Sequence, residues 1–369
     1  MSLLLLSLLL QSYASNNVIL FIGDGMGPAV VTASRIQYDG LAWDKFPNTA
    51  IVSTKSYNNH VTDSAAAATA MATGSKTDNG VLSLSPKDSK EHRSSLKTLA
   101  DIAKSKNYSV GLVTTTEVTH ATPAAFYSHR EDREDDSGIA IDLFNSKLDL
   151  MFGGSTKSVE KALSKNPAKF SILRDKKDLP SLPGKPYLGI FEMGHIPYYE
   201  TSEFNKATQP RLYEMTASAI DVLSKNKAGF FLMVEGGRID HALHKNNIPQ
   251  ALIETSEFSL AVTTAMEKLK QLKKLDKTLI IITADHDTAG LNINGYLNIK
   301  KPLITDRKIA TSEKDSIPVL TSTAPVHAHS AAHTAVDVSL YARGPCGQSF
   351  SGLIENTDIF NKIQSCLNK

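Results

Sequence analysis

The stretch VILFIGD at residues 18–24 predicts a buried strand that ends in a glycine and a carboxylate. Three further apolar runs have the same character and also lead into polar residues, at 110–115, 229–234 and 278–283. Continuous apolar runs of this length are typical of strands buried on both faces of a parallel sheet. Helical apolar patterns lie between them, at 94–105, 213–225 and 253–272. This alternation predicts an α/β fold with a doubly wound, mostly parallel central sheet and helices on both faces.

Polar side chains follow each of these runs. Asp24 follows the first run, Glu235 the third and Asp285 the fourth, and His120 and Thr122 come a few residues after the second. In doubly wound sheets, ligands bind at the carboxyl ends of the strands. We therefore expect four strands to bring metal-binding side chains to one edge of the sheet.

The stretch TDSAAAATA at residues 62–70 places Ser64 in the first turn of an alanine-rich helix, with Asp63 as its cap and Gly74 as its end. The first backbone N–H groups of a helix have no intrahelical partner, so they can bind an anion beside the serine. Considered alone, Asp-Ser before an alanine run is more often an ordinary helix cap. The local sequence leaves both interpretations open.

Two histidine-containing stretches offer further metal ligands. Asp240 and His244 are four residues apart, so on a helix they project from the same face, and carboxylate with imidazole suits zinc. The adjoining His241 cannot face the same way and instead could line the pocket or pair with an anion. Residues 327–334 contain three histidines, although a loop histidine is more often exposed than a ligand.

Composition limits the partners and the metal ligands. The 369-residue chain has a formal net charge of +2 and no sustained basic run, so we expect no nucleic-acid-binding surface and a small-molecule substrate. Its two cysteines, Cys346 and Cys366, form either one disulfide or two free thiols. Any metal must therefore be held by His, Asp and Glu.

The N-terminus resembles a secretory signal. An apolar run at 3–10 precedes Ser12-Tyr13-Ala14, although no Lys or Arg comes before it. We predict a signal peptide at 1–14, a single domain at 15–369 and a periplasmic or secreted protein. The apolar run is too short to span a bilayer, so no membrane span is expected.

Seven pieces of the sequence, in the same order along the chain, resemble the alkaline phosphatase family. They are IGDGMG at 22–27, TDSAA at 62–66, HATPA at 120–124, Arg133, EGGRIDH at 235–241, TADH at 283–286 and His333-Thr334. Seven pieces in order are far more specific than any single motif. The resemblance implies an alkaline phosphatase that hydrolyses a broad range of phosphate monoesters.

The resemblance also implies roles for individual residues. Ser64 would be the nucleophile that becomes phosphoserine, and Arg133 would hold two phosphate oxygens, with His241 as a further substrate-binding residue. Two zinc ions and one magnesium ion are implied. The first zinc would be held by Asp240, His244 and His333, and the second by Asp24, Asp285 and His286. Magnesium would be held by Thr122 and Glu235, linked to the second zinc through Asp24 and contacted through water by His120.

The family resemblance further implies a homodimer with a small crown-like insertion at about 288–330. The nearest rival functions are a phosphodiesterase or a sulfatase of the same superfamily. A different class of rival is a phosphate- or metal-binding protein that kept the fold without catalysis. Ser64, Arg133, Thr122 and Glu235 together favour the monoesterase, and the complete set of catalytic residues disfavours the binding protein.

Overall fold

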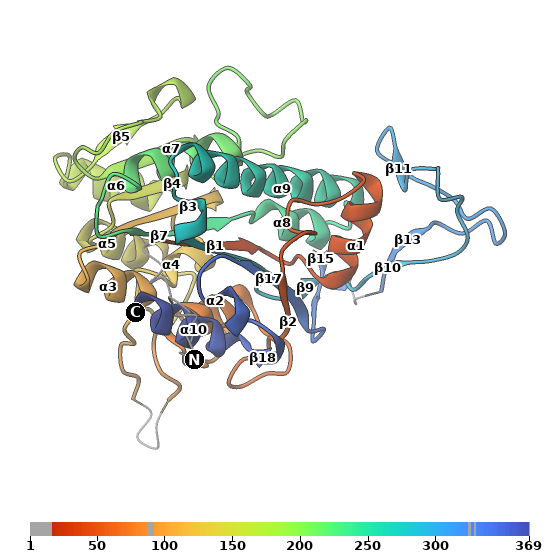
Figure 1. Cartoon of the computed structure of the whole chain (residues 1–369), viewed down its shortest axis with the longest axis horizontal. Coiled ribbons are helices and arrows are strands. Elements are labelled where there is room, and N and C mark those ends of the chain that lie inside the picture. Colours follow the sequence, from red (N-terminus) through yellow and green to blue (C-terminus); the bar gives the residue numbers. More distant parts are fainter. Residues whose placement is uncertain (1–16, 88–91, 324–325, 328–329, 369) are drawn as a thin grey trace, which may run out of the picture.

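The computed structural model describes residues 17–87, 92–323, 326–327 and 330–368. The expected signal peptide at 1–14 lies outside the described residues. A ten-stranded sheet forms the centre of the molecule (Figure 1). Its strands, from one edge to the other, are β18 (Gly352–Glu355), β2 (Asn48–Ser53), β17 (Val338–Arg343), β8 (Thr278–Ala284), β1 (Asn17–Gly23), β7 (Phe230–Glu235), β3 (Ser109–Glu117), β4 (Leu150–Ser155), β6 (Tyr187–Met193) and β5 (Ser171–Leu173).

The sheet is parallel except at β17, which runs antiparallel to both β2 and β8. Helices cover both faces (Figure 1). One face carries α1 (Pro28–Gln37), α7 (Leu212–Leu223), α8 (Arg238–His244) and α9 (Ile248–Gln271). The other carries α2 (Ser64–Thr73), α3 (Leu99–Ser105), α4 (Ala121–Ala124) and α10 (Asn356–Leu367). The predicted fold class is confirmed.

The remaining elements of the described residues are short or peripheral. Helices α5 (Asp136–Asn145) and α6 (Lys157–Lys165) pack against each other, and three short 3₁₀ turns are η1 (Lys176–Asp178), η2 (Leu275–Lys277) and η3 (Gly347–Ser349). Four two-stranded sheets pair β10 (Leu291–Ile293) with β13 (Leu320–Ser322), β11 (Ile304–Thr305) with β12 (Lys308–Ile309), β14 (Val326–His327) with β15 (Ser330–Ala331), and β9 (Asp287–Thr288) with β16 (His333–Thr334). The first two pairs project from the body at the right of Figure 1, within the segment expected to form the crown-like insertion.

The register of the parallel strands explains why the predicted polar residues meet. Ile22 of β1 lies opposite Glu235 of β7, and Gly23 lies opposite Ala284 of β8. Asp24 and Asp285 therefore leave neighbouring strands at the same level, with Glu235 beside them. Because these strands are parallel, the three carboxylates converge at one edge of the sheet.

Helix boundaries differ from the sequence expectation where a cap decides them. The helix expected at 94–105 begins only at Leu99, because the Thr98 hydroxyl accepts a hydrogen bond from the Asp101 N–H at 3.1 Å. The helix expected from 253 begins at Ile248, because the side chain of Asn247 accepts from the Gln250 N–H at 3.2 Å. Apolar periodicity locates the helix body, while the capping side chain sets its first residue.

Cys346 and Cys366 form a disulfide that joins η3 to the last turn of α10. None of the helices in the described ranges combines the length and apolar character that crossing a membrane requires.

Glu254 is a buried carboxylate on α9. Its Oε1 accepts hydrogen bonds from the Tyr199 N–H at 2.8 Å and the Gln250 amide at 2.9 Å. Burial raises its pKa from 4.5 to about 7. Between these two values the unfolded chain releases a proton that the folded protein keeps, so this group lowers the stability as the pH rises through that window.

We expect Glu254→Gln to remove this part of the pH dependence, because the amide oxygen can accept both hydrogen bonds without a charge. At pH 8 the melting temperature should rise by about 2–4 °C relative to the parent, and at pH 4 by much less. Thermal denaturation across this pH range tests it, with exposed Glu267→Gln on the same helix as the control. An equal rise at both pH values would contradict the explanation.

Candidate active site at the carboxyl edge of the sheet

Ser64 is the first residue of α2 and is 3% exposed. Asp63 caps the helix, with its Oδ1 accepting from the Ala66 N–H at 3.0 Å. At the other end, Gly74 adopts φ 74°, and a Cβ there would lie 2.5 Å from the Phe360 ring. All ten residues of α2 are buried. The helix therefore holds the Ser64 hydroxyl in a fixed position beside unpaired backbone N–H groups.

Arg133 is held beside this helix by the same cap residue. Its Nη1 donates to Asp63 Oδ2 at 3.1 Å, and that oxygen also accepts from the Gly80 N–H at 3.0 Å. Nη2 lies 3.5 Å from Nε2 of His120. Asp63 therefore both caps α2 and orients the guanidinium of Arg133. The second role was not apparent from its capping position in the sequence.

The first cluster of metal-binding side chains contains Asp24, Asp285 and His286, whose ligand atoms all lie within 4.8 Å of one another. Nε2 of His286 is 3.5 Å from Asp24 Oδ1, 3.3 Å from Asp285 Oδ2 and 3.1 Å from the Ser64 hydroxyl. The consecutive residues Asp285 and His286 can both face inward because β8 ends at Ala284. Ser64 therefore lies directly beside this cluster.

The second cluster contains Asp240, His244 and His333. Nε2 of His244 is 3.2 Å from Asp240 Oδ2 and 3.1 Å from Nε2 of His333, which is 3.7 Å from Asp240 Oδ1. The rings of His286 and His333 stack with centroids 3.6 Å apart, so the first two clusters are adjacent. Helix α8 carries Asp240 and His244 on one face, as their spacing predicts.

The third cluster contains Asp24, His120 and Glu235. Nδ1 of His120 lies 3.7 Å from Glu235 Oε1. The other oxygen, Oε2, accepts from the hydroxyls of Thr114 and Thr116. Thr122 enters the same region in α4, fully buried.

Within the part of the chain that the structure describes, these clusters leave several buried polar atoms without hydrogen-bond partners. They are Oδ1 and Oδ2 of Asp24, Oδ2 of Asp285, Oε1 of Glu235, Oγ1 of Thr122 and Nδ1 of His120. Burial raises the pKa of Asp24 well above its usual value, with Asp285, Asp240 and Glu235 adding to the effect. Burial likewise raises the pKa of Asp285 to about 7. Unpaired buried carboxylates this close together call for cations between them.

The three clusters offer different metal-binding atoms and therefore suit different ions. Carboxylate with imidazole, as in the first two clusters, suits zinc. The carboxylates of Asp24 and Glu235 with the Thr122 hydroxyl are oxygen donors, which suit magnesium with several retained waters. The residues present thus fit all three implied metals.

Several neighbouring residues escaped the sequence analysis. Thr288 donates to Asp240 Oδ1 at 2.6 Å, and Asp287 accepts from the Thr334 hydroxyl at 2.6 Å. The ring of His195 lies 4.5 Å from that of His241 and 5.9 Å from that of His120. His195 follows β6 by two residues, so its place after a parallel strand could have identified it.

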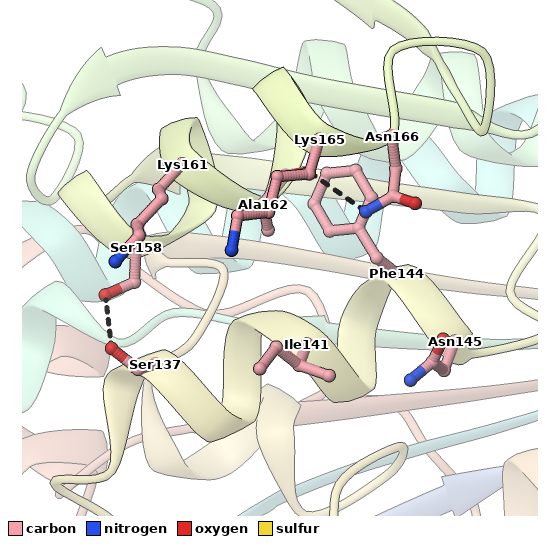
Figure 2. A pocket seen from close by; sticks show the side chains of 9 residues that line it. All are labelled: Ser137, Ile141, Phe144, Asn145, Ser158, Lys161, Ala162, Lys165 and Asn166. Atoms are coloured by element: carbon pink, nitrogen blue, oxygen red, sulfur yellow. Dashed lines mark hydrogen bonds between the residues drawn. The ribbon is translucent and has the colours of Figure 1, made fainter.

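A cavity of about 140 Å³ between α5 and α6 lies apart from these clusters (Figure 2). Its walls carry Lys161 and Lys165 from α6 and Ile141 and Phe144 from α5. None of the predicted site residues lines it, so it has no part in the site.

Comparison with known proteins identifies the family. The sequence profile described as alkaline phosphatase matches residues 15–165, 157–321 and 296–369. The chain belongs to the alkaline phosphatase family. Alkaline phosphatase 3 of Bacillus subtilis (strain 168) is 32% identical to it, over 95% of this chain and 88% of that protein. The alkaline phosphatase of Escherichia coli (strain K12) is 30% identical, over 97% of this chain and 87% of that protein.

Solved structures of the family agree with the fold. Alkaline phosphatase from the Antarctic bacterium TAB5 superimposes with a TM-score of 0.80 at 28% identity, covering 97% of this chain and 99% of that chain. A variant of the TAB5 enzyme, at 29% identity and the same TM-score, has magnesium bound in its M3 site. Members of this family are phosphomonoesterase hydrolases, and the family likeness indicates metal cofactors for this chain.

Proposed function

We propose that this protein hydrolyses the phosphate monoesters of many alcohols through a phosphoserine intermediate on Ser64. The observation that carries the proposal is the Ser64 hydroxyl at the N-terminus of α2, 3.1 Å from His286 of the first cluster. Arg133 stands beside the same helix end. A nucleophile, a guanidinium fork and two carboxylate–imidazole clusters together suit attack on a phosphate dianion.

Two zinc ions and one magnesium ion would be held by the three clusters. The first zinc would bind Asp240, His244 and His333, the second Asp24, Asp285 and His286, and magnesium would bind Asp24, Thr122 and Glu235, with His120 beside it. When bound, the ions supply Lewis-acid stabilisation of the negative charge on the attacking, transferring and leaving oxygens.

The protein's own residues position and transfer the phosphoryl group. Arg133, oriented by Asp63, is placed to donate to two phosphoryl oxygens. Ser64 Oγ gives up its proton to solvent and attacks phosphorus, forming the Oγ–P bond as the bond from phosphorus to the alcohol oxygen breaks, and the leaving alkoxide takes a proton from solvent. Water then attacks the phosphoserine, and cleavage of the Oγ–P bond restores Ser64 and releases inorganic phosphate.

We propose a periplasmic or secreted location and a homodimer for this enzyme. The Cys346–Cys366 disulfide supports an oxidising compartment, where such bonds persist. The expected signal peptide agrees with this location. The homodimer rests on family likeness.

The test of the function is hydrolysis of p-nitrophenyl phosphate at alkaline pH with zinc and magnesium. Bis(p-nitrophenyl) phosphate and p-nitrophenyl sulfate serve as the comparison substrates. We expect the monoester to be the preferred substrate by at least about 10²-fold in kcat/KM, because Arg133 is placed to hold two non-bridging oxygens. Faster turnover of the diester or the sulfate would favour the sister hydrolases, and retention of phosphate without turnover would favour a binding protein.

Removing the metals should abolish most of this activity. After dialysis against a chelator we expect kcat to fall by about 10²-fold or more, and to recover on adding zinc with magnesium. The physical reason is that the buried carboxylates then repel the phosphate dianion. Activity that survives chelation, with metal content shown to be negligible by elemental analysis, would contradict the metal assignments.

His241 offers a test of how phosphate is retained. Its Nδ1 accepts a hydrogen bond from Arg238 at 2.7 Å, and burial lowers the pKa of its imidazole to about 2. A lysine there adds a positive charge near the proposed phosphate site, so we expect His241→Lys to lower the phosphate inhibition constant by about threefold to tenfold. An unchanged inhibition constant would exclude His241 from substrate binding.

A further inference from the structure

A second cavity, of about 390 Å³, opens beside the proposed metal site. It is lined by His195, Arg238, His241, His244, Lys245 and Ser330. His244 belongs both to this cavity and to the second cluster, so the two share a wall. The volume falls within the range of small-molecule sites, roughly 300–1,000 Å³.

The position of Ser64 indicates which part of the substrate would enter this cavity. Ser64 lies against His286 of the first cluster, so the nucleophile approaches phosphorus from that side. In an in-line displacement the leaving oxygen lies opposite the nucleophile. The second cluster adjoins the first through the stacked rings of His286 and His333, and its His244 also lines this cavity. The alcohol part of the substrate would therefore lie in this cavity.

The cavity is positively charged. Arg238 and Lys245 both line it, and among the described residues no carboxylate does. Within the described part of the chain, no carboxylate oxygen lies within 4.0 Å of the charged nitrogens of either side chain, although Glu254, Glu203 and Glu117 act on Arg238 from farther away. Their charges are thus available to an anion that enters the cavity.

The side chain of Arg238 is held in place in the wall of this cavity. It is held by stacking on the Tyr198 ring at 3.8 Å and by the hydrogen bond from Nη1 to His241. The residue is 9% exposed, and its buried Nε–H has no hydrogen-bond partner among the residues described. Glu254, Glu203 and Glu117 act on this guanidinium electrostatically, yet none of them forms an ion pair with it. Burying a guanidinium without a direct ion-pair partner costs free energy, which an incoming anion can offset. The ammonium of Lys245 lies 5.5 Å from the centre of the same Tyr198 ring.

We propose that Arg238 and Lys245 bind a second anionic group carried by the alcohol part of the substrate. Phosphate monoesters whose alcohol bears a carboxylate or a further phosphate are then preferred over esters of neutral alcohols. The planar fork of arginine suits both kinds of anion. This preference rests on the proposed phosphomonoesterase function and adds a substrate class to it.

The test compares 4-carboxyphenyl phosphate with 4-carbamoylphenyl phosphate, which have nearly the same shape and differ in charge. We expect the ratio of their kcat/KM values to fall by about tenfold from the parent to Arg238→Met, a change that corresponds to about 1.4 kcal/mol. Lys245→Met should lower the same ratio by about threefold. Comparing the change in ratio between proteins cancels the intrinsic difference in reactivity of the two esters.

Lys227→Met is the matched control, because this exposed lysine precedes β7 and so lies at the opposite end of the strand from Arg238. It should leave the ratio unchanged. Lys245 is also exposed, so its variant provides a test even where Arg238→Met folds poorly. The same ratio in the parent and all three variants would overturn the second-anion site while the phosphomonoesterase function stands. No turnover of either ester by the metal-loaded parent would overturn the proposed function, and this inference with it.

Discussion

Replacing Ser64 with alanine is expected to lower kcat for p-nitrophenyl phosphate on the order of 10⁴-fold. The hydroxyl is the group placed to form a bond to phosphorus, and the surrounding charges can stabilise that bond only if the oxygen is present. The substitution removes one buried oxygen next to the Asp63 cap and leaves the helix intact. We therefore expect a folded protein with little activity.

The decisive measurement is the site of phosphorylation. Parent protein mixed with substrate and quenched in acid should yield a phosphorylated peptide at Ser64 by mass spectrometry, and Ser64→Ala should yield none. Ser164→Ala, an exposed serine on α6, is the matched control and should keep full activity. High activity in Ser64→Ala, with no phosphopeptide in the parent, would mean that water attacks the ester directly.

Asp24→Asn is expected to change activity and stability in opposite directions. Asp24 is fully buried, both of its carboxylate oxygens lack hydrogen-bond partners among the described residues, and Asp285 and Glu235 lie close by. With metals, the substitution removes a ligand proposed for two ions, so kcat should fall about 10³-fold or more. Without metals, the substitution removes one of several buried charges that lie close together. The amide that it introduces can donate to the unpaired oxygen of Asp285.

Melting curves in chelator test the second half of this prediction. We expect the metal-free Asp24→Asn protein to melt about 2–5 °C above the metal-free parent, and the order to reverse once zinc and magnesium are added. Bound zinc per chain, measured by elemental analysis, should fall in the variant. Asp276→Asn, exposed and at the far end of β8, should affect none of these values. A metal-free variant less stable than the parent would show that Asp24 has a structural partner.

The fold and the meeting of polar residues at the carboxyl ends of the strands were predictable from local patterns, whereas the place of His333 in the second cluster followed only from the family resemblance. Apolar runs such as residues 18–22 identify buried parallel strands, and parallel strands must end at the same edge of the sheet. Asp24, Glu235 and Asp285 therefore meet because each directly follows or ends such a run. The four-residue spacing of Asp240 and His244 likewise predicts their common direction on α8.

Contacts between side chains distant in the sequence could not be predicted in this way. In the sequence, Asp63 is predicted only as a helix cap. The tertiary structure shows that its second oxygen also orients Arg133, which lies 70 residues further along the chain. The pairing of Cys346 with Cys366 was likewise open until the packing of α10 brought them together.

By itself, the sequence determined the type of fold, the edge of the sheet that carries the candidate site and the residue types gathered there, because strand and helix periodicity control these locally. Tertiary structure alone decided which metal-binding atoms are left without hydrogen-bond partners among the described residues and how Ser64 is aligned with His286. It also decided that Arg238 and Lys245 share a charged cavity with His244. These features depend on distances of a few ångströms between separate elements, which packing sets and local sequence patterns do not encode.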